Sequence, residues 1–408
     1  MNHTALLPHL FRTEFSKITA VLTKVFGFEH IGVAEDIAGD TFIAALETWP
    51  YKGVPKSPQA WLYNVAKNKA RNYMKRNHIF SEKVLPEVSN ATAGFEEMKI
   101  DLSDQHIKDS LLQMLFAVCH PSIAAEAQIG LSLRILCGFG IEEIANAFLV
   151  NKETISKRLF RAKEKLRLEN VQIEYPGELE IGKRLETVLT TLYLLFNEGY
   201  YSESHESVLR EELCLEAMRL MYLLVENEST DLPHVNALLS LMCFHASRFA
   251  ARKNNNGGIV LYHDQDETLW NNELIAKGAY YLHRASTGNT VSKYHIEAGI
   301  AWWQTHKADT KEKWENILQL YNRLLQMEYS PVAALNRTFA LSKVYGKQEA
   351  IVEAEKLQLT NNHFYYTLLG ELYKDTDKSK AKINFQEAFA LARTETERQT
   401  IKKKINDL

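Results

Sequence analysis

The chain has 408 residues, of which 46% are hydrophobic and 24% charged, and its formal net charge is -3. The length excludes one small domain and supplies material for roughly two to four hydrophobic cores. No apolar run approaches the roughly 18 residues that span a bilayer, and the N-terminus lacks the pattern of a secretory signal. A cytoplasmic protein without a membrane segment is therefore expected. The small negative charge does not exclude a nucleic-acid partner, because the cations gather in two segments.

Residues 34–49 and 58–77 are two neighbouring helical segments of opposite charge. The first has the pattern of an acidic amphipathic helix. The second begins at Pro58 and interleaves aromatic residues with five cations and no acid. Flat rings beside guanidinium and ammonium groups suit unstacked bases and a single-stranded backbone. The contrast in charge predicts two different partners for the two helices.

The next segment, residues 78–106, loses helical periodicity and is expected to be a linker. From residue 107 to 170 a second helical domain is predicted, and its end has the pattern of a helix-turn-helix. Ile144, Ala145 and Phe148 form one apolar stripe, residues 149–151 interrupt it, and a second stripe starts at Ile155.

The second helix of this pair is strongly basic on its polar face. Its cations are Lys152, Lys157, Arg158, Arg161, Lys163, Lys165 and Arg167, against only two acids, Glu153 and Glu164. This charge suits a recognition helix that lies against phosphates and base edges in a major groove. A solvated basic surface is the alternative reading of the same pattern, and the helix alone does not decide between them.

Taken together, the segments AEDIAGDTFIAALETW and PQAWLYNVAKNKARNYMKRN and the helix-turn-helix resemble an extracytoplasmic-function sigma factor of bacterial RNA polymerase. The order and spacing of the three blocks match over roughly residues 8–170. Two positions depart from the family pattern, with Leu149 where a turn glycine is common and Asn72 where an aspartate is common.

The resemblance implies a role for each block. Residues 8–77 would bind core polymerase and the -10 element, and residues 107–170 would read the -35 element. Core-polymerase binding then falls on Asp36, Asp40, Phe42 and Trp49. DNA binding falls on Trp61, Asn64, Lys67, Asn68, Arg71, Lys75 and Arg76 in the first domain, and on Lys152, Thr154, Ser156, Lys157, Arg158 and Arg161 in the second. No catalytic residue, cofactor or metal is implied.

Beyond Gly177 the chain continues as helices, so the whole molecule is predicted to be all-α. Residues 178–290 are expected to form a helical extension domain. Residues 291–408 contain a weak repeat, in which the segment 336–354 recurs as 366–385. Small residues at matching places suit the close helix packing of tetratricopeptide-like repeats. The four cysteines lie in apolar helical contexts without CxxC spacing and are predicted to be buried, reduced thiols.

Two segments of the extension contain polar residues that need an explanation. Glu198, His263, Asp264 and Asp266 could build a metal or acid/base centre. The simpler prediction is that Asp264 or Asp266 caps the helix that begins near Thr268, and that Asn197 and Gly199 close the preceding helix.

The same segments, LFNEGY and DQD followed by a tryptophan, resemble the sigma subgroup with a long helical C-terminal extension. This resemblance implies a built-in regulator that contacts the sigma domains. Its regulatory residues are then Asn197, Glu198, Asp264, Asp266 and Trp270.

The sequence thus predicts a sigma factor, which is not an enzyme and which recruits core RNA polymerase to promoter DNA. Two other classes of function stay open. One is a helical enzyme with its site at residues 263–270, tethered to DNA by the N-terminal half. The other is a scaffold whose repeats bind a protein partner.

Overall fold

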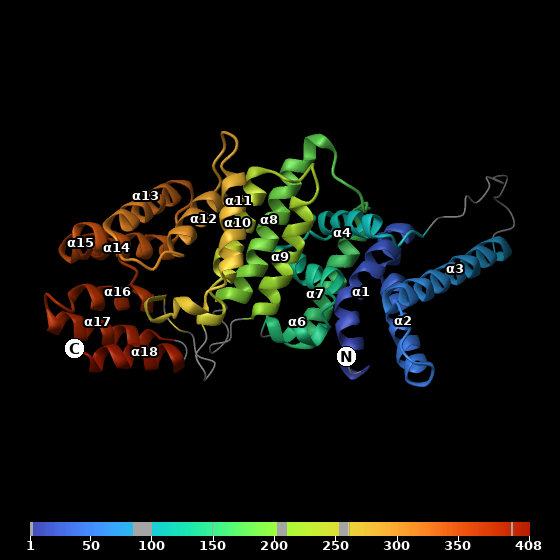
Figure 1. Cartoon of the computed structure of the whole chain (residues 1–408), viewed down its shortest axis with the longest axis horizontal. Helices are drawn as coiled ribbons and strands as arrows, with labels where there is room; N and C mark the ends of the chain where they lie inside the picture. The colour runs from blue at the N-terminus through green and yellow to red at the C-terminus, as the bar shows by residue number, and fades with distance from the viewer. Residues whose placement is uncertain are drawn as a thin grey trace. The chain divides into compact units, whose positions relative to one another are not determined.

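The computed structural model describes residues 3–84, 100–148, 150–201, 210–252, 260, 262–392 and 395–408. This described part contains 18 α-helices, a few short 3-10 or π-helical segments and no strand, which confirms the all-α prediction (Figure 1). The chain forms two compact units, residues 1–194 and 195–408. None of the described helices is long and apolar enough to cross a bilayer.

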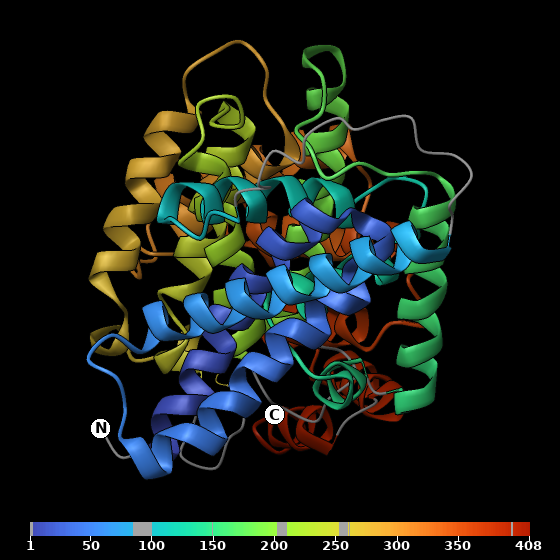
Figure 2. The same cartoon turned by 90° about the vertical axis from the view of Figure 1, so that its right-hand side faces the viewer.

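The first unit begins with three long helices that pack against one another (Figure 2). They are α1 (His3–Phe26), α2 (Ile31–Lys52) and α3 (Pro58–Val84). Helix α2 ends where Gly53 takes a φ of 79°, a conformation that favours glycine, and donates its N–H to the Trp49 carbonyl. Helix α3 continues beyond residue 77, so the segment expected to be a linker begins inside this helix. Residues 85–99 of that expected linker lie outside the described residues.

Shorter helices complete the first unit. They are α4 (Asp104–Val118), α5 (Ala125–Leu131), a π-helical segment (Ser132–Leu136), α6 (Ile141–Ala147) and α7 (Lys152–Leu168). Helix α8 (Glu178–Tyr201) starts in this unit and ends in the second. Its first half contacts α4 and α5 through two hydrogen bonds. Arg184 donates to the Phe116 carbonyl at 2.6 Å, and the buried Thr191 donates to Gln128 Oε1 at 2.8 Å.

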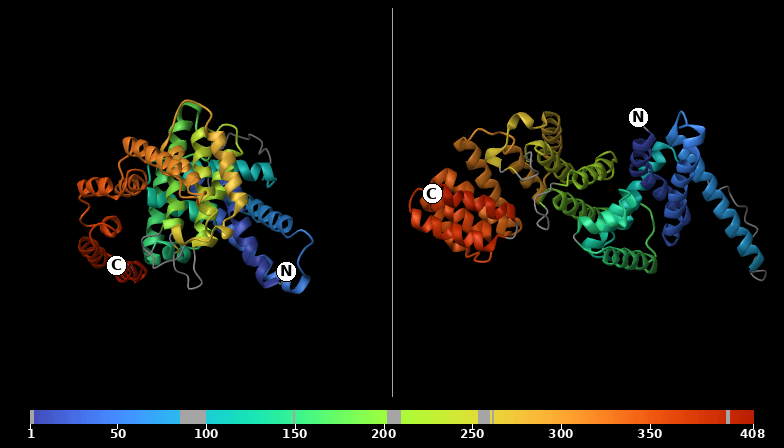
Figure 3. Two further views of the ribbon diagram at one scale, coloured as in Figure 1. Left: turned by 60° about the vertical axis from the view of Figure 1, so that its left-hand side comes forward. Right: turned by 90° about the horizontal axis from the view of Figure 1, so that it is seen from below.

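The second unit continues with a succession of helices (Figure 3). Its helices are α9 (Glu211–Val225), α10 (Pro233–Ala246), α11 (Asn272–Ala285), α12 (Lys293–Trp303), α13 (Lys311–Met327), α14 (Pro331–Tyr345), α15 (Lys347–Leu357), α16 (His363–Tyr373), α17 (Lys378–Leu391) and α18 (Glu395–Asn406). From α12 onward each helix packs on the next, with one shared hydrophobic core. The small residues of the predicted repeat lie at helix contacts: Ala350, Ala354 and Ala381 are buried, and a Cβ on Gly370 would be 2.5 Å from the Phe385 ring.

All four cysteines are buried and none is in a disulfide, which confirms that prediction. Burial raises the pKa of the Cys119 thiol to about 11 and the pKa of the Cys214 and Cys243 thiols to about 12. A thiol that stays protonated is a poor nucleophile.

We therefore expect a thiol reagent at pH 8 to label almost no cysteine in the native protein and all four in denaturant. The raised pKa values also predict pH-dependent stability, because the folded state holds these protons more tightly than the unfolded state. That stabilisation is complete below about pH 9 and is lost as the pH rises through 11 to 12. Rapid labelling of native protein, counted by mass spectrometry, would contradict the burial.

Candidate nucleic-acid interface

Helix α3 presents one polar stripe to solvent. Asn64, Asn68, Arg71 and Lys75 are exposed and recur at helical spacing, while Leu62, Ala66 and Ala70 on the opposite face are buried. Arg76 is also exposed, Lys67 is half-buried, and the half-buried Trp61 ring packs edge-on against Trp49 with centroids 5.4 Å apart. The structure therefore places the predicted DNA-binding residues of this helix on or beside one surface.

A buried carboxylate fixes this helix to α1. The side chain of Glu14 is fully buried and accepts hydrogen bonds from Gln59 Nε2 at 3.1 Å, from Lys17 Nζ at 3.0 Å and from the Tyr63 hydroxyl. Burial, and then the contact with Glu14, raises the pKa of the Tyr63 hydroxyl far above its usual value, so Tyr63 stays a donor. Both Gln59 and Tyr63 belong to the first turns of α3, so the buried acid orients the exposed stripe. Local pattern did not indicate this role, since Glu14 lies in an ordinary amphipathic helix.

Helix α7 separates a buried face from a basic one. Asn151 caps the helix by accepting from the Thr154 N–H at 2.7 Å and from its hydroxyl at 2.6 Å. Ile155, Leu159, Ala162 and Leu166 are buried. The exposed predicted residues are Lys152, Thr154, Lys157 and Arg161, and Ser156 and Arg158 are half-buried.

Helix α7 also carries an exposed aromatic residue, Phe160, that was not predicted from the sequence. The side chain of Phe160 is 66% exposed, although its neighbours in the sequence include buried apolar residues. An exposed ring between cations offers an apolar contact to a base edge, such as a thymine methyl group. The helical spacing of the sequence could have predicted its exposure, because Phe160 falls outside the buried stripe of Ile155, Leu159 and Ala162.

A surface hollow of about 410 Å³ lies beside α7. Arg158, Arg161 and Lys165 contribute positive charge to its wall, and Ser122 and Thr154 contribute hydroxyl groups. None of the described residues that line it is acidic. A wall of this composition can hold a phosphate group, and it gives Arg158 a different environment from the exposed Lys157.

Helix α2 carries the residues predicted to bind core polymerase, and the structure separates them into two groups. Asp36 and Asp40 are exposed, and Asp40 lies 3.4 Å from Lys69 of α3. Phe42 and Trp49 are buried in the core of α1–α3, which corrects their assignment to a binding surface. Both sides of α2 carry apolar residues, so the pattern did not distinguish the core face.

Exposed apolar side chains take the place of those two on the outer face of α2. Ile43 and Leu46 are more than half exposed and lie about one and two turns beyond Asp40. An acidic surface with an apolar edge is the composition expected of a protein-binding helix face.

The predicted regulatory residues of the extension do not form one site. Asn197 and Glu198 are half-buried inside α8, which continues to Tyr201, so Asn197 and Gly199 do not end the helix as expected. Gly199 instead lies against α9 (Glu211–Val225), where a Cβ would be 2.7 Å from Cys214 Sγ. Among the described residues, no group of three or more histidine, cysteine or acidic side chains is placed to hold a metal ion. The side chain of His263 lies outside the described residues.

The segment around residue 265 has a packing role. Asp266 caps a short 3-10 helix by accepting from the Thr268 N–H at 2.9 Å, which confirms the capping prediction for this residue, while Asp264 is exposed. Trp270 is buried with its ring stacked near Tyr262 at 6.3 Å. The buried Gln265, which the sequence did not single out, donates its side-chain N–H to the Val260 carbonyl at 3.2 Å, and its backbone carbonyl accepts from Lys307 Nζ.

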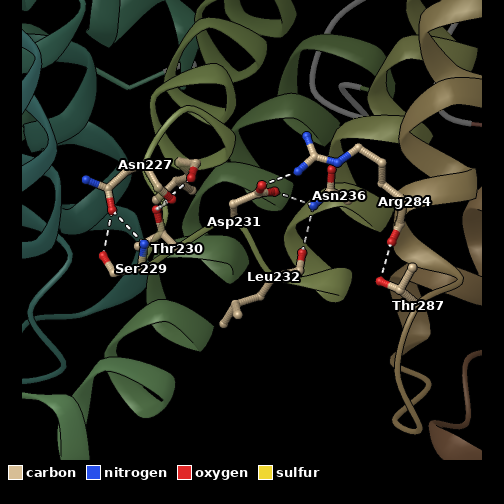
Figure 4. A network of polar contacts seen from close by, with 9 residues as sticks. Asn227, Ser229, Thr230, Asp231, Leu232, Asn236, Arg284 and Thr287 are labelled. Atoms are coloured by element: carbon tan, nitrogen blue, oxygen red, sulfur yellow. Dashed lines mark hydrogen bonds and ion pairs between the residues drawn. The ribbon is translucent and has the colours of Figure 1, made fainter.

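A second polar network joins α10 to α11 in the same unit (Figure 4). Asp231, just before α10, accepts from Asn236 Nδ2 at 2.7 Å and pairs with Arg284 near the end of α11. Thr230 is buried beside it and donates to the Leu224 carbonyl at 2.6 Å. These contacts lie between neighbouring elements of one unit and stabilise the helix pair.

Comparison with known proteins gives one relative that spans nearly the whole chain. It is an uncharacterized protein of Rhizobium meliloti (strain 1021), 32% identical over 390 residues, which cover 93% of this chain and 91% of the relative. The chain belongs to the same family as this Rhizobium protein. No solved structure matches the chain.

Two family models match parts of the chain. Residues 10–78 match sigma-70 region 2, and residues 184–286 match a family of unknown function, DUF6596. An ECF RNA polymerase sigma-E factor of Haemophilus influenzae is 26% identical over 153 residues, which cover 36% of this chain and 79% of that protein. The match to sigma-70 region 2 and the Haemophilus relative support a sigma factor, a kind of protein that acts in transcription without being an enzyme. The region 2 match covers most of α1–α3.

Proposed function

We propose that this protein is an alternative sigma factor of the extracytoplasmic-function class, which binds core RNA polymerase and directs it to a subset of promoters. The observation that supports this most is the match of residues 10–78 to sigma-70 region 2, the segment whose helix α3 presents Asn64, Asn68, Arg71 and Lys75 to solvent. Core polymerase would bind the outer face of α2 through Asp36 and Asp40. The -10 element would bind α3, in the cytoplasm where polymerase works.

The helices α6 and α7 would form the second promoter-binding domain, within residues 107–170. As a helix-turn-helix, they would place α7 in the major groove of the -35 element, with Lys152, Lys157 and Arg161 toward the DNA. Arg158 beside the hollow would contact a phosphate, and Phe160 would add an apolar contact to a base. The cap formed by Asn151 and Thr154 rigidifies the end of the helix that enters the groove.

The remainder of the chain would be a fused regulator made of a helical domain, residues 178–290, and tetratricopeptide-like repeats, residues 291–408. Two helical hairpins, α14–α15 and α16–α17, with small residues at their contacts support the repeat assignment. The regulator would act by contact with the sigma domains. Asn197, Glu198, Asp264, Asp266 and Trp270 would support its fold rather than bind a ligand.

Charge reversal on α2 tests the proposed function. We expect Asp36→Lys to lower the affinity of the full-length chain for core polymerase by on the order of tenfold, because repulsion replaces attraction at an exposed contact. The matched control is Glu312→Lys, which reverses an exposed acid at the start of α13. Binding is measured with purified core enzyme at moderate salt, followed by run-off transcription on the promoters that mapped transcript starts identify. If the unaltered chain neither binds core enzyme nor starts transcripts, the proposed function is wrong.

A further inference from the structure

A single partly buried acid, Glu35 of α2, binds two cations from distant parts of the first unit. Its Oε1 lies 3.0 Å from Arg134 Nε in the π-helical segment, and its Oε2 lies 2.6 Å from Lys163 Nζ in α7. The Glu35 side chain is only 11% exposed. Both carboxylate oxygens are therefore engaged, and both bonds cross from the α1–α3 part of the unit to the part built from α4–α7.

Other contacts cross the same boundary. Helix α1 packs along α4, and Arg12 of α1 lies 2.9 Å from Glu143 Oε1 of α6. The Arg12 guanidinium lies 5.4 Å from the centre of the Phe139 ring, and Arg134 lies 5.8 Å from that of Phe15. The Arg12 pair is about half exposed and is screened by salt, whereas the bonds of Glu35 are shielded. Glu35 is thus more shielded from solvent than the Arg12–Glu143 pair that crosses the same boundary.

This closed arrangement does not fit simultaneous promoter contacts, if the proposed function holds. Elements at -10 and -35 are about 25 base pairs apart, which is about 85 Å of duplex at 3.4 Å per base pair. A compact body of residues 1–194 has a radius of gyration of about 16 Å, so it is roughly 40 Å across. Helices α3 and α7 cannot reach both elements from within one such body.

We infer that Glu35 is a latch that holds the two promoter-binding parts together in a closed, resting state. Lys163 is then a latch residue on the flank of α7, and its contact with Glu35 keeps that flank against α2. Opening must break both bonds of Glu35, and it leaves Arg134 and Lys163 free to take other partners. This inference rests on the proposed function for its biological meaning, but the latch itself is a property of the chain alone.

The test measures a distance within the full-length protein, without polymerase or DNA. Two spin labels are attached at Lys52→Cys, at the end of α2, and Glu169→Cys, just after α7, which are both exposed positions. The native cysteines are buried and stay unlabelled. We expect one short distance in the parent protein. Glu35→Gln should raise the fraction at long distance by on the order of tenfold, and Glu35→Lys should raise it further because it faces two cations.

Two further variants separate the latch from simple loss of fold. Glu47→Gln changes an exposed acid of the same helix and should leave the distance unchanged. The double variant Glu35→Lys with Lys163→Glu recreates one of the two ion pairs in the opposite sense, while Arg134 still faces a cation, so it should lower the fraction at long distance below that of Glu35→Lys alone. If Glu35→Gln and Glu35→Lys both keep the parent distance, or if the double variant is as open as Glu35→Lys alone, the latch is wrong. A latch that opens as expected in a chain that never binds polymerase would instead refute the proposed function.

Discussion

Replacing Gly199 with alanine should destabilise the second unit by about 2–3 kcal/mol, although alanine is normally the better helix former. The added Cβ would lie 2.7 Å from Cys214 Sγ, 2.8 Å from the Arg210 carbonyl oxygen and 3.1 Å from the Cys214 amide nitrogen. Two of these atoms belong to the backbone, so no side-chain rotation relieves the contact and α9 must move. The measurement is urea unfolding followed by circular dichroism, with hydrogen exchange to locate the loss of protection in α8 and α9.

The control is an alanine at the other glycine of α8. Nothing lies within 4 Å of a Cβ built on Gly182. Gly182→Ala should therefore stabilise the protein by about 0.5–1 kcal/mol, because it reduces the freedom of the unfolded chain and favours the helix. If both variants change stability in the same direction, the close approach of α8 and α9 at Gly199 does not exist.

The second large effect is expected on DNA binding. Reversing Lys157 and Arg161 together to glutamate should weaken binding to a promoter duplex by about 10² to 10³-fold, since each contact is worth about 1–3 kcal/mol. Both side chains are exposed on α7. If both side chains contact DNA phosphates, the slope of log affinity against log salt concentration should become shallower by about 1.8, the value for two phosphate contacts. Fluorescence anisotropy at several salt concentrations measures both quantities.

A variant with the same change in net charge is the necessary comparison. Lys402 and Lys403 are exposed on α18, and their double reversal to glutamate should leave promoter affinity within about twofold if binding is local to α7. Equal loss in the two double variants would mean that affinity follows net charge rather than contacts of α7. Unchanged affinity of the α7 variant would remove this helix from the proposed interface.

Much of the fold and part of the interface could be predicted from local patterns. The period of Ile155, Leu159 and Ala162 predicted the buried face of α7, so its exposed basic stripe followed from the sequence, whereas no buried face was predicted for α3. The prediction failed where a helix is apolar on both sides. On α2 the buried residues are Phe42 and Trp49 and the exposed ones Ile43 and Leu46, and periodicity alone does not rank such residues.

Long-range contacts and close approaches were the other source of error. Glu35 binds cations that are 99 and 128 residues away in the sequence, so no window around it could indicate its role. Gly199 was expected to end a helix because glycine commonly does so, yet here it admits a neighbouring helix. In both cases tertiary packing determines the role of the residue, whereas the local sequence predicts only a surface acid at position 35 and a helix end at position 199.

The continuity of α8 limits how this protein can be divided in the laboratory or by recombination. Leu185, Val188 and Leu192 are buried with the first unit, whereas Phe196 and Tyr200 pack with His245 in the second. A cut before Glu178 would strip the first unit of a covering helix and expose the apolar surface beneath it, so the shortened chain should be prone to aggregate. A cut after Tyr201 would instead expose the apolar C-terminal end of α8, because the second unit that packs against Phe196 and Tyr200 would be gone. Neither part is therefore expected to fold well alone when α8 is removed or cut. A fusion protein that carries the extension would have to include the whole of α8.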